Sequence, residues 1–397
     1  MQVENARGLR WLVAGGLALG IATSVTVRRS TPSRAAVRIE PRNGGERAAV
    51  VALSNDLWSD DGPVVEVVSA AALDRLRELG VPYRVVVADI DALADDERRR
   101  LAHRAEVADW FAEYRDLDEI NAYLEKLHDQ HPDVARLRSI GTSLEGRPIR
   151  ALEIGHGSIH VVLDGGHHAR EWLSVMVPTC IADRLASGDG HILDAVTFEI
   201  VPVVNPDGYH YSWTVDRYWR KNRRGGYGVD LNRNYSVAWG GAGSSGDKQQ
   251  PTYRGENAFS EPETRAMRAL FESVTVAAHV DFHAYSQVIV YPWSHQRTPP
   301  ADRDKLAAIA DRMSSAMYGA HGKRYAIRPG SELTVGSSGT AGDWSYGEHG
   351  ALSFLVELRP ASSEDGGFVL PPDQIRPACD ESMAAVLELA DWLVGHP

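Results

Sequence analysis

The chain contains only two cysteines, Cys180 and Cys379, so a framework of several disulfides is excluded. One bridge is still open to it, because a bridge requires only that the two Cα atoms come within about 7 Å. Positive charge is also scarce: 42 Lys and Arg residues stand against 54 Asp and Glu residues, which gives a net charge of −12. Because phosphate neutralisation requires a concentrated basic face, this balance excludes a nucleic-acid-binding protein.

Long apolar runs are also scarce. A single run, from Trp11 to Val27, follows Arg7 and Arg10. A basic segment before a short apolar one is typical of an export signal, and a run of about 17 residues is also close to the minimum for a membrane-spanning helix. We therefore expect residues 1–30 to be a signal peptide or an uncleaved membrane anchor, and the protein to be secreted or to face the outside of the cell envelope.

The length of 397 residues is too great for one small core and predicts two domains. Residues 31–47 are rich in Pro, Gly, Ser and Arg and are predicted to be a linker. Residues 48–100 show strand-like and helical patterns in the order β-β-α-β, which predicts a small α+β open sandwich. The charged stretch 94–100 is either a solvated helix face or an exposed connector with a basic cleavage site. Residues 101–108 are expected to lead into the next domain.

The remainder, residues 109–397, alternates helical and strand-like segments. The predicted strands are apolar and of the buried type, and cover residues 159–163, 198–204, 275–281, 288–291 and 353–358. The predicted helices cover residues 116–127, 172–186, 262–274, 301–320 and 377–394. This alternation predicts an α/β fold with a mixed, mostly buried central sheet, helices on both faces, and ligand groups at the strand ends.

His168 and Glu171 lie in a turn between a predicted strand and a predicted helix. There an imidazole and a carboxylate can converge on one metal ion, and a third ligand would complete a catalytic zinc site with one open position. His279 and His283 lie at the end of another predicted strand, and His283, where the strand meets its loop, is the better third ligand. His279 is expected to pack or to support a ligand, and His167 to point away from His168.

A hydrolase also needs a base for its water and a cation for the developing oxyanion. Glu357 lies in a strongly apolar strand, where burial raises the pKa of a carboxyl group as water activation requires. The alternative for Glu357 is a buried ion pair with Arg359. Two basic clusters, residues 216–222 and 230–234, could supply the cation or could be surface charge. Arg233, beside an asparagine, suits bidentate recognition of a substrate carboxylate.

Together these segments resemble the zinc carboxypeptidases of the pancreatic carboxypeptidase A/B type. The resemblance runs from about residue 110 to the end and implies a carboxypeptidase-like catalytic domain over residues 109–397. It rests on Gly-Gly-His-His-Ala-Arg-Glu-Trp (165–172), Asn-Pro-Asp-Gly (205–208), Tyr-Trp-Arg-Lys (218–221), Asp-Leu-Asn-Arg-Asn (230–234), Asp-Phe-His (281–283) and Glu-Leu-Arg (357–359). Residues 48–100 resemble the family's activation prodomain, which folds over the active site as an intramolecular inhibitor.

The resemblance implies one Zn²⁺ ion bound by His168, Glu171 and His283. It further implies that Glu357 is the general base and that Arg220 holds the oxyanion. The other implied roles are recognition of the substrate's terminal carboxylate by Asn232 and Arg233, outer substrate contacts by Arg170 and Arg217, and support of a zinc-ligating histidine by Asp230. The implied substrate is the C-terminus of a peptide or protein, and the enzyme is expected to be a monomer.

Two departures from the family pattern affect substrate binding. Val335 occupies the position of a mobile tyrosine that closes over the substrate, and Tyr285 or Tyr346 would have to compensate. Gly342 occupies the position that forms the floor of the specificity pocket, where an acid would select Lys or Arg. Without that acid we expect a preference for neutral or hydrophobic C-terminal residues.

Two other functions are compatible with these residues. One is a zinc-binding protein with little or no peptidase activity, which Val335 alone favours and which Glu357 and Arg220 oppose. The other is a cell-wall amidopeptidase that acts on muropeptides, because the same zinc site could perform that hydrolysis.

Overall fold

The protein is described from a computed structural model. It covers residues 34–43, 46, 50, 56–59, 64–68, 70–104, 107–188, 190–333 and 336–396. The predicted signal peptide or anchor at residues 1–30 and the valine at position 335 lie outside these ranges. Within them, none of the helices combines the length and the apolar character needed to cross a bilayer.

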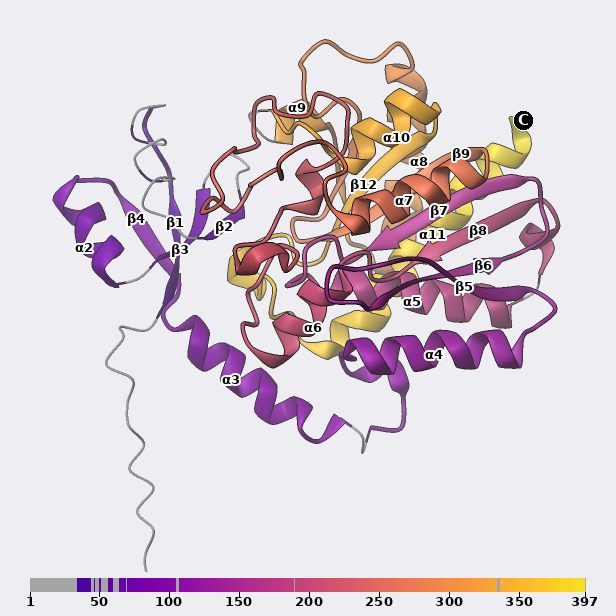
Figure 1. The fold of residues 1–397 in the computed structure, drawn as a ribbon, viewed down its shortest axis with the longest axis horizontal. Helices are drawn as coiled ribbons and strands as arrows, with labels where there is room; N and C mark the ends of the chain where they lie inside the picture. Colours follow the sequence, from indigo (N-terminus) through magenta and orange to yellow (C-terminus); the bar gives the residue numbers. More distant parts are fainter. Residues whose placement is uncertain are drawn as a thin grey trace, which may run out of the picture. The chain divides into compact units, whose positions relative to one another are not determined.

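A mixed sheet of eight strands forms the centre of the larger part of the chain (Figure 1), in the order β11-β10-β12-β9-β7-β8-β6-β5. The four strands at its centre, β12, β9, β7 and β8, run parallel, and their outer neighbours β10 and β6 run antiparallel to them. The strands are β5 (Ala135–Thr142), β6 (Pro148–Ile154), β7 (Ile159–Gly165), β8 (Val196–Val201), β9 (Val276–Ala284), β10 (Val288–Tyr291), β11 (Ala326–Pro329) and β12 (Leu352–Leu358).

Helices pack on both faces of this sheet, as predicted. One apolar cluster joins the sheet to α4, α5, α8 and α11, and a second joins it to α7 and α10. The helices are α4 (Leu117–Gln130), α5 (Trp172–Ser187), α6 (Pro206–Thr214), α7 (Pro262–Ser273), α8 (Arg303–His321), α9 (Gly330–Leu333), α10 (Ala341–His349) and α11 (Ile375–Gly395). The elements β5, β6, β11, α6, α9 and α10 were not predicted.

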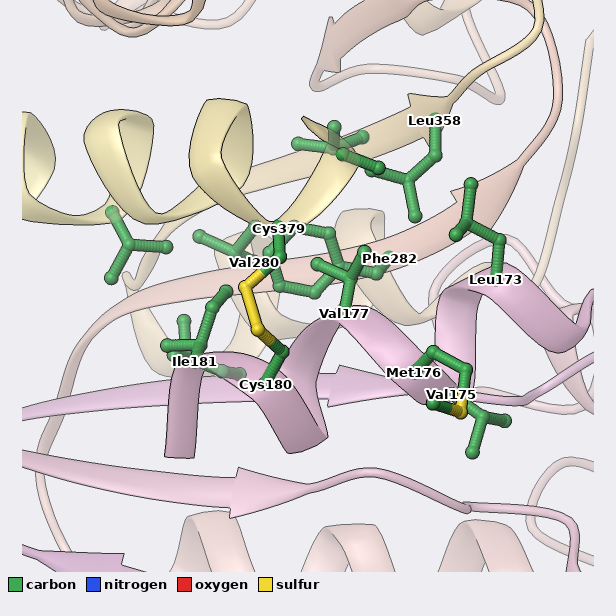
Figure 2. Close-up of a cluster of buried hydrophobic side chains, with 14 of the residues drawn as sticks. Leu173, Val175, Met176, Val177, Cys180, Ile181, Val280, Phe282, Leu358 and Cys379 are labelled. Atoms are coloured by element: carbon green, nitrogen blue, oxygen red, sulfur yellow. A yellow bond between two sulfur atoms is a disulfide. The ribbon is translucent and has the colours of Figure 1, made fainter. Parts of the chain in front are cut away.

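Cys180 and Cys379 form the single bridge that the sequence left open. It joins α5 to α11, with a Cα–Cα distance of 6.1 Å. Figure 2 shows the bridge among buried apolar side chains of α5, β9 and β12. Because 199 residues separate the two cysteines, the bridge closes a long loop and restricts the unfolded chain strongly.

The N-terminal elements form a separate antiparallel sheet in the order β2-β3-β1-β4. The strands are β1 (Ala35–Ile39), β2 (Asp56–Ser59), β3 (Val64–Val68) and β4 (Tyr83–Val87), and the helices of this part of the chain are α2 (Ala70–Glu78) and α3 (Ile90–Leu101). The strand β1 lies inside the segment predicted to be a linker, and it pairs with both β3 and β4. The residue at position 50 is helical, although a strand was predicted there.

The charged stretch 94–100 lies within α3. Arg98 and Arg99 pair with Asp95 and Asp96 one turn away, which is the arrangement of a solvated helix face.

Candidate metal centre and active site

The turn that carries His168 and Glu171 follows β7 and leads into α5. Two glycines allow it: a Cβ atom at Gly165 would lie 1.9 Å from the backbone oxygen of Ser174, and Gly166 has a φ of +67°. The chain therefore turns sharply at the carboxyl end of a central strand, which is where α/β folds present ligand groups.

Two other central strands, β9 and β12, carry His283 and Glu357. β9 and β12 are parallel neighbours in which His283 is paired with Glu357. Side chains alternate between the two faces of a sheet, so both of these polar groups face the cleft while Phe282 and Val356 face the apolar cluster beneath. The predicted strand ended at residue 281, whereas β9 continues to Ala284, so His283 lies within the strand.

The three predicted metal ligands converge. The Nδ1 atom of His168 lies 2.8 Å from Glu171 Oε1, and the Nδ1 atom of His283 lies 2.9 Å from Glu171 Oε2 and 3.0 Å from His168 Nδ1. All three side chains are buried. Two imidazole nitrogens and a carboxylate that face one point form the donor set of a catalytic zinc site.

The second nitrogen of each imidazole faces a buried carboxylate, which fixes the ring for metal binding. His168 Nε2 lies 3.2 Å from Asp230, the residue expected to support a zinc-ligating histidine, and His283 Nε2 lies 3.0 Å from Asp281. Although burial opposes ionisation, Arg220 and His168 hold the pKa of Asp230 well below its usual value. Burial also opposes ionisation of Glu171, but the two histidines lower its pKa. The donor set is a carboxylate and two imidazole rings oriented by buried carboxylates, which fits zinc.

Glu357 differs from these paired carboxylates. Its Oε2 atom is buried without a hydrogen-bond partner. Burial, and then the negative charge of Glu171, raise the pKa of Glu357 to about 8. The alternative of an ion pair with Arg359 is wrong, because Arg359 pairs with Glu381 on α11. An uncompensated carboxyl group beside a metal-ligand set suits a general base.

Three further predicted residues line the same cleft, which also contains the metal ligands and Glu357. Arg220 donates to Asp230 at 2.9 Å and lies 3.9 Å from Glu171. The Asn232 amide nitrogen lies 3.2 Å from His283 Nε2. Arg233 donates to two backbone carbonyl groups and to a serine hydroxyl group, all of which are neutral, so its guanidinium group can still bind a carboxylate.

Other predicted substrate contacts lie apart from this cleft. Arg170 is fully buried, with its guanidinium group over the ring of Phe368. Arg217 is 2% exposed and pairs with Glu97 of α3. Their roles in outer substrate binding stay predictions, and they would require this part of the protein to open.

Gly342, Tyr285 and Tyr346 were predicted to affect substrate binding, and of these three Tyr285 alone lines the cleft. Gly342 is the second residue of α10, where an added Cβ atom would lie 3.3 Å from Ser353 Oγ. Tyr285 lines the cleft and packs edge-on against Phe368. Tyr346 instead donates its hydroxyl group to Asp302.

Two contributors to the site were missed. Trp58 of β2 lines the cleft and stacks on Tyr218, and Asp281 supports His283. The sequence carried a signal for Asp281 only, because Asp281 and His283 are two residues apart on one strand and so point the same way.

Comparisons with known proteins agree with this geometry. The sequence profile described as "Zinc carboxypeptidase" matches residues 120–385. The chain is 35% identical over 300 residues to carboxypeptidase B of Astacus astacus, covering 72% of this chain and 98% of that protein. It is 32% identical to zinc carboxypeptidase A 1 of Anopheles gambiae, covering 78% and 75%.

Solved structures give the same result. The carboxypeptidase A of Helicoverpa armigera superposes with a TM-score of 0.84 at 26% identity, covering 92% of this chain and 99% of that one. Thrombin activatable fibrinolysis inhibitor superposes with a TM-score of 0.81 at 29% identity, covering 92% and 100%. The chain therefore belongs to the zinc carboxypeptidase family and is a metallocarboxypeptidase of the A/B type.

Proposed function

We propose that this enzyme removes single C-terminal residues from peptides or proteins, using Glu357 as the base and one zinc ion held by His168, Glu171 and His283. The observation that carries the proposal is the unpaired carboxyl oxygen of Glu357 in the cleft that the three ligands share. When bound, zinc supplies a Lewis acid that makes water more acidic and polarises a carbonyl group.

The protein's own residues perform the other steps. Arg233 and Asn232 bind the terminal carboxylate, which places the last peptide bond beside Glu357. Glu357 accepts a proton from the attacking water and passes it to the leaving amine. Arg220, which is 15% exposed at its side chain, donates to the carbonyl oxygen as negative charge develops there.

A peptide with a free C-terminus and its C-terminal amide test this assignment. The free acid should be cleaved, and the amide should be cleaved at least about tenfold more slowly, because it cannot form the charge-assisted pair with Arg233. A chelator should abolish activity and zinc should restore it. Equal cleavage of acid and amide would contradict the proposed carboxylate recognition.

We further propose a preference for neutral or hydrophobic C-terminal side chains. Among the described lining residues of the cleft, the only acids are Glu171 and Glu357, and both already have a role. The remaining wall includes Val290, Leu355 and Thr340, so a cationic side chain would be buried without a counter-charge. Peptides that differ only in a final Phe, Leu, Lys or Arg test this preference, and faster release of Lys or Arg would refute it.

The N-terminal domain, predicted over residues 48–100, is proposed to keep the enzyme latent until it is removed. Trp58 occupies part of the cleft wall, and Glu97 engages the buried Arg217. Cleavage between residues 101 and 108 should therefore raise activity, measured on one preparation before and after limited proteolysis. Full activity of the intact chain would contradict latency.

Secretion, or exposure outside the cell envelope, is proposed as the location of the enzyme. The disulfide between Cys180 and Cys379 favours an oxidising compartment, and the predicted signal at residues 1–30 is consistent with export. The mass of the mature N-terminus would show whether that segment is removed, and the sedimentation velocity of the purified enzyme would test the predicted monomer.

A further inference from the structure

A set of buried polar side chains extends from Asp281, which contacts His283, into the protein interior. We call it the buried polar chain. Its members are Asp281, His167, Asp164, His279, Ser345 and Ser353, and each of them is fully buried at 0% exposure.

The sheet brings these groups together through strand register. His279, Asp281 and His283 alternate along β9 and therefore share one face. Asp164 on β7 is paired with Asp281, and Ser353 on β12 is paired with His279. The polar groups are therefore neighbours across three adjacent parallel strands.

One end of the buried polar chain holds His283. Asp281 uses one carboxyl oxygen to contact His283 Nε2 at 3.0 Å and the other to contact His167 Nδ1 at 3.1 Å. The Nε2 atom of His167 lies 2.8 Å from the hydroxyl group of Tyr235. A neutral His167 that donates from Nδ1 to Asp281 can accept at Nε2 from Tyr235, so both of its nitrogens are satisfied.

The other end reaches the first turn of α10. Asp164 lies 3.7 Å from His167 Nδ1 through one oxygen and 2.9 Å from His279 Nε2 through the other. His279 Nδ1 lies 2.9 Å from Ser345 Oγ, which in turn lies 3.1 Å from Ser353 Oγ. Ser345 also donates to the backbone oxygen of residue 342 at 3.2 Å. The far end is thus anchored to the turn that begins α10.

Burying these polar groups costs free energy of desolvation. The need to fill the core therefore does not by itself account for them. Apolar side chains of similar volume often stabilise a core as well as a buried ionic group does, or better. Here hydrogen bonds join His283, Asp281 and His167 at one end and Asp164, His279 and the two serines at the other, and the two ends meet in a charge contact of 3.7 Å between Asp164 and His167. Buried polar contacts of this kind restrict their members to one arrangement. The benefit specific to this place is a fixed orientation of the His283 ring, whose Nδ1 atom must face the other two ligands.

We propose that the buried polar chain positions His283 for zinc, and that Asp164 and His279, which contact no proposed ligand, are positioning residues on which zinc affinity depends. This inference rests on the proposed function, because it takes His283 as a zinc ligand. Groups that orient metal ligands typically contribute 10- to 100-fold in metal affinity. For residues one link further from the ligand we expect the lower end, about tenfold.

The test measures zinc affinity of the full chain by competition with a chromophoric chelator, together with the visible spectrum of the cobalt-substituted protein. Asp164→Asn keeps the shape of the side chain and removes its charge, and should weaken zinc binding about tenfold and change the cobalt bands. Glu199→Gln is the matched control: Glu199 is an equally buried carboxylate on β8, paired with Arg138. It should lower stability and leave zinc affinity and the cobalt spectrum unchanged.

The outcomes separate the two levels of inference. Wild-type protein that fails to bind zinc would contradict the proposed function itself. Wild-type affinity and an unchanged cobalt spectrum in Asp164→Asn would overturn the positioning role and leave a packing role only. Should that variant not fold, His279→Gln serves instead: it can still donate to Asp164 but loses Ser345, and unchanged zinc affinity there would equally overturn the proposal.

Discussion

Replacement of Glu357 by glutamine should make the zinc-free protein more stable while it removes catalysis. The unpaired carboxyl group is costly to ionise, because burial and the charge of Glu171 raise its pKa from 4.5 to about 8. Glutamine has nearly the same shape and is always neutral. The variant therefore reproduces the protonated form of Glu357 at every pH.

The size of the effect depends on pH in a defined way. Since the folded protein binds this proton more tightly than the unfolded chain does, the stability of the wild type falls as pH rises from 4.5 to about 8. At about 1.4 kcal/mol per pKa unit, the cost at pH 7 is roughly 3 kcal/mol. The group is partly exposed to the cleft, and solvent screening reduces this to on the order of 2 kcal/mol.

The assay is urea unfolding of chelator-treated wild type and Glu357→Gln at several pH values from 4 to 9. The free-energy difference should be near zero at pH 4, grow through neutral pH and level off above pH 8. Added zinc should reduce the difference at neutral pH, because a cation beside Glu171 lowers the pKa of Glu357. A difference independent of pH, or a variant less stable at pH 8, would refute this account of Glu357.

Three other changes can be measured directly. Arg233→Lys should lower kcat/KM for free C-termini by about 10- to 100-fold, mainly through KM, because a lysine cannot form the bidentate pair; an unchanged KM would contradict this. Replacing Cys180 and Cys379 together by serine should cost about 2–4 kcal/mol of unfolding free energy and leave kcat nearly unchanged, as urea titration and a peptide assay would show. Glu97→Gln should raise the activity of the uncleaved chain severalfold, because it weakens the contact of α3 with Arg217, whereas activity after proteolysis should not change; equal activities before cleavage would contradict latency through this contact.

Local patterns predicted groups that the structure brings together in one cleft. The two glycines before His168 and the three-residue spacing to Glu171 predict a turn that presents both groups, and the isolated acid at position 357 stands out in an apolar strand. The preference for His283 over His279 also agrees with the structure, since one faces the other ligands and the other lies deeper. Each of these signals can be recognised within a segment of a few consecutive residues.

Non-local contacts were beyond this reasoning. The pairing of Asp164 with His279 depends on which strands become neighbours in the sheet. The burial of Arg217 depends on α3, which is more than a hundred residues earlier in the chain. The strand β1 was missed because composition alone marks its surroundings as a linker, whereas its pairing with β3 and β4 determines its conformation.

The direct pairing of β9 with β12 determines where insertions and deletions can be tolerated. Phe282 and Phe354 face the helices, while His283 and Glu357 alternate with such residues and face the cleft. Adding or removing one residue within either strand would turn the following side chains over, so that a phenylalanine would meet solvent and a histidine or glutamate would meet the apolar layer. Length changes in the surface loops beyond these strands leave that alternation intact, and natural or engineered variation in length should therefore concentrate there.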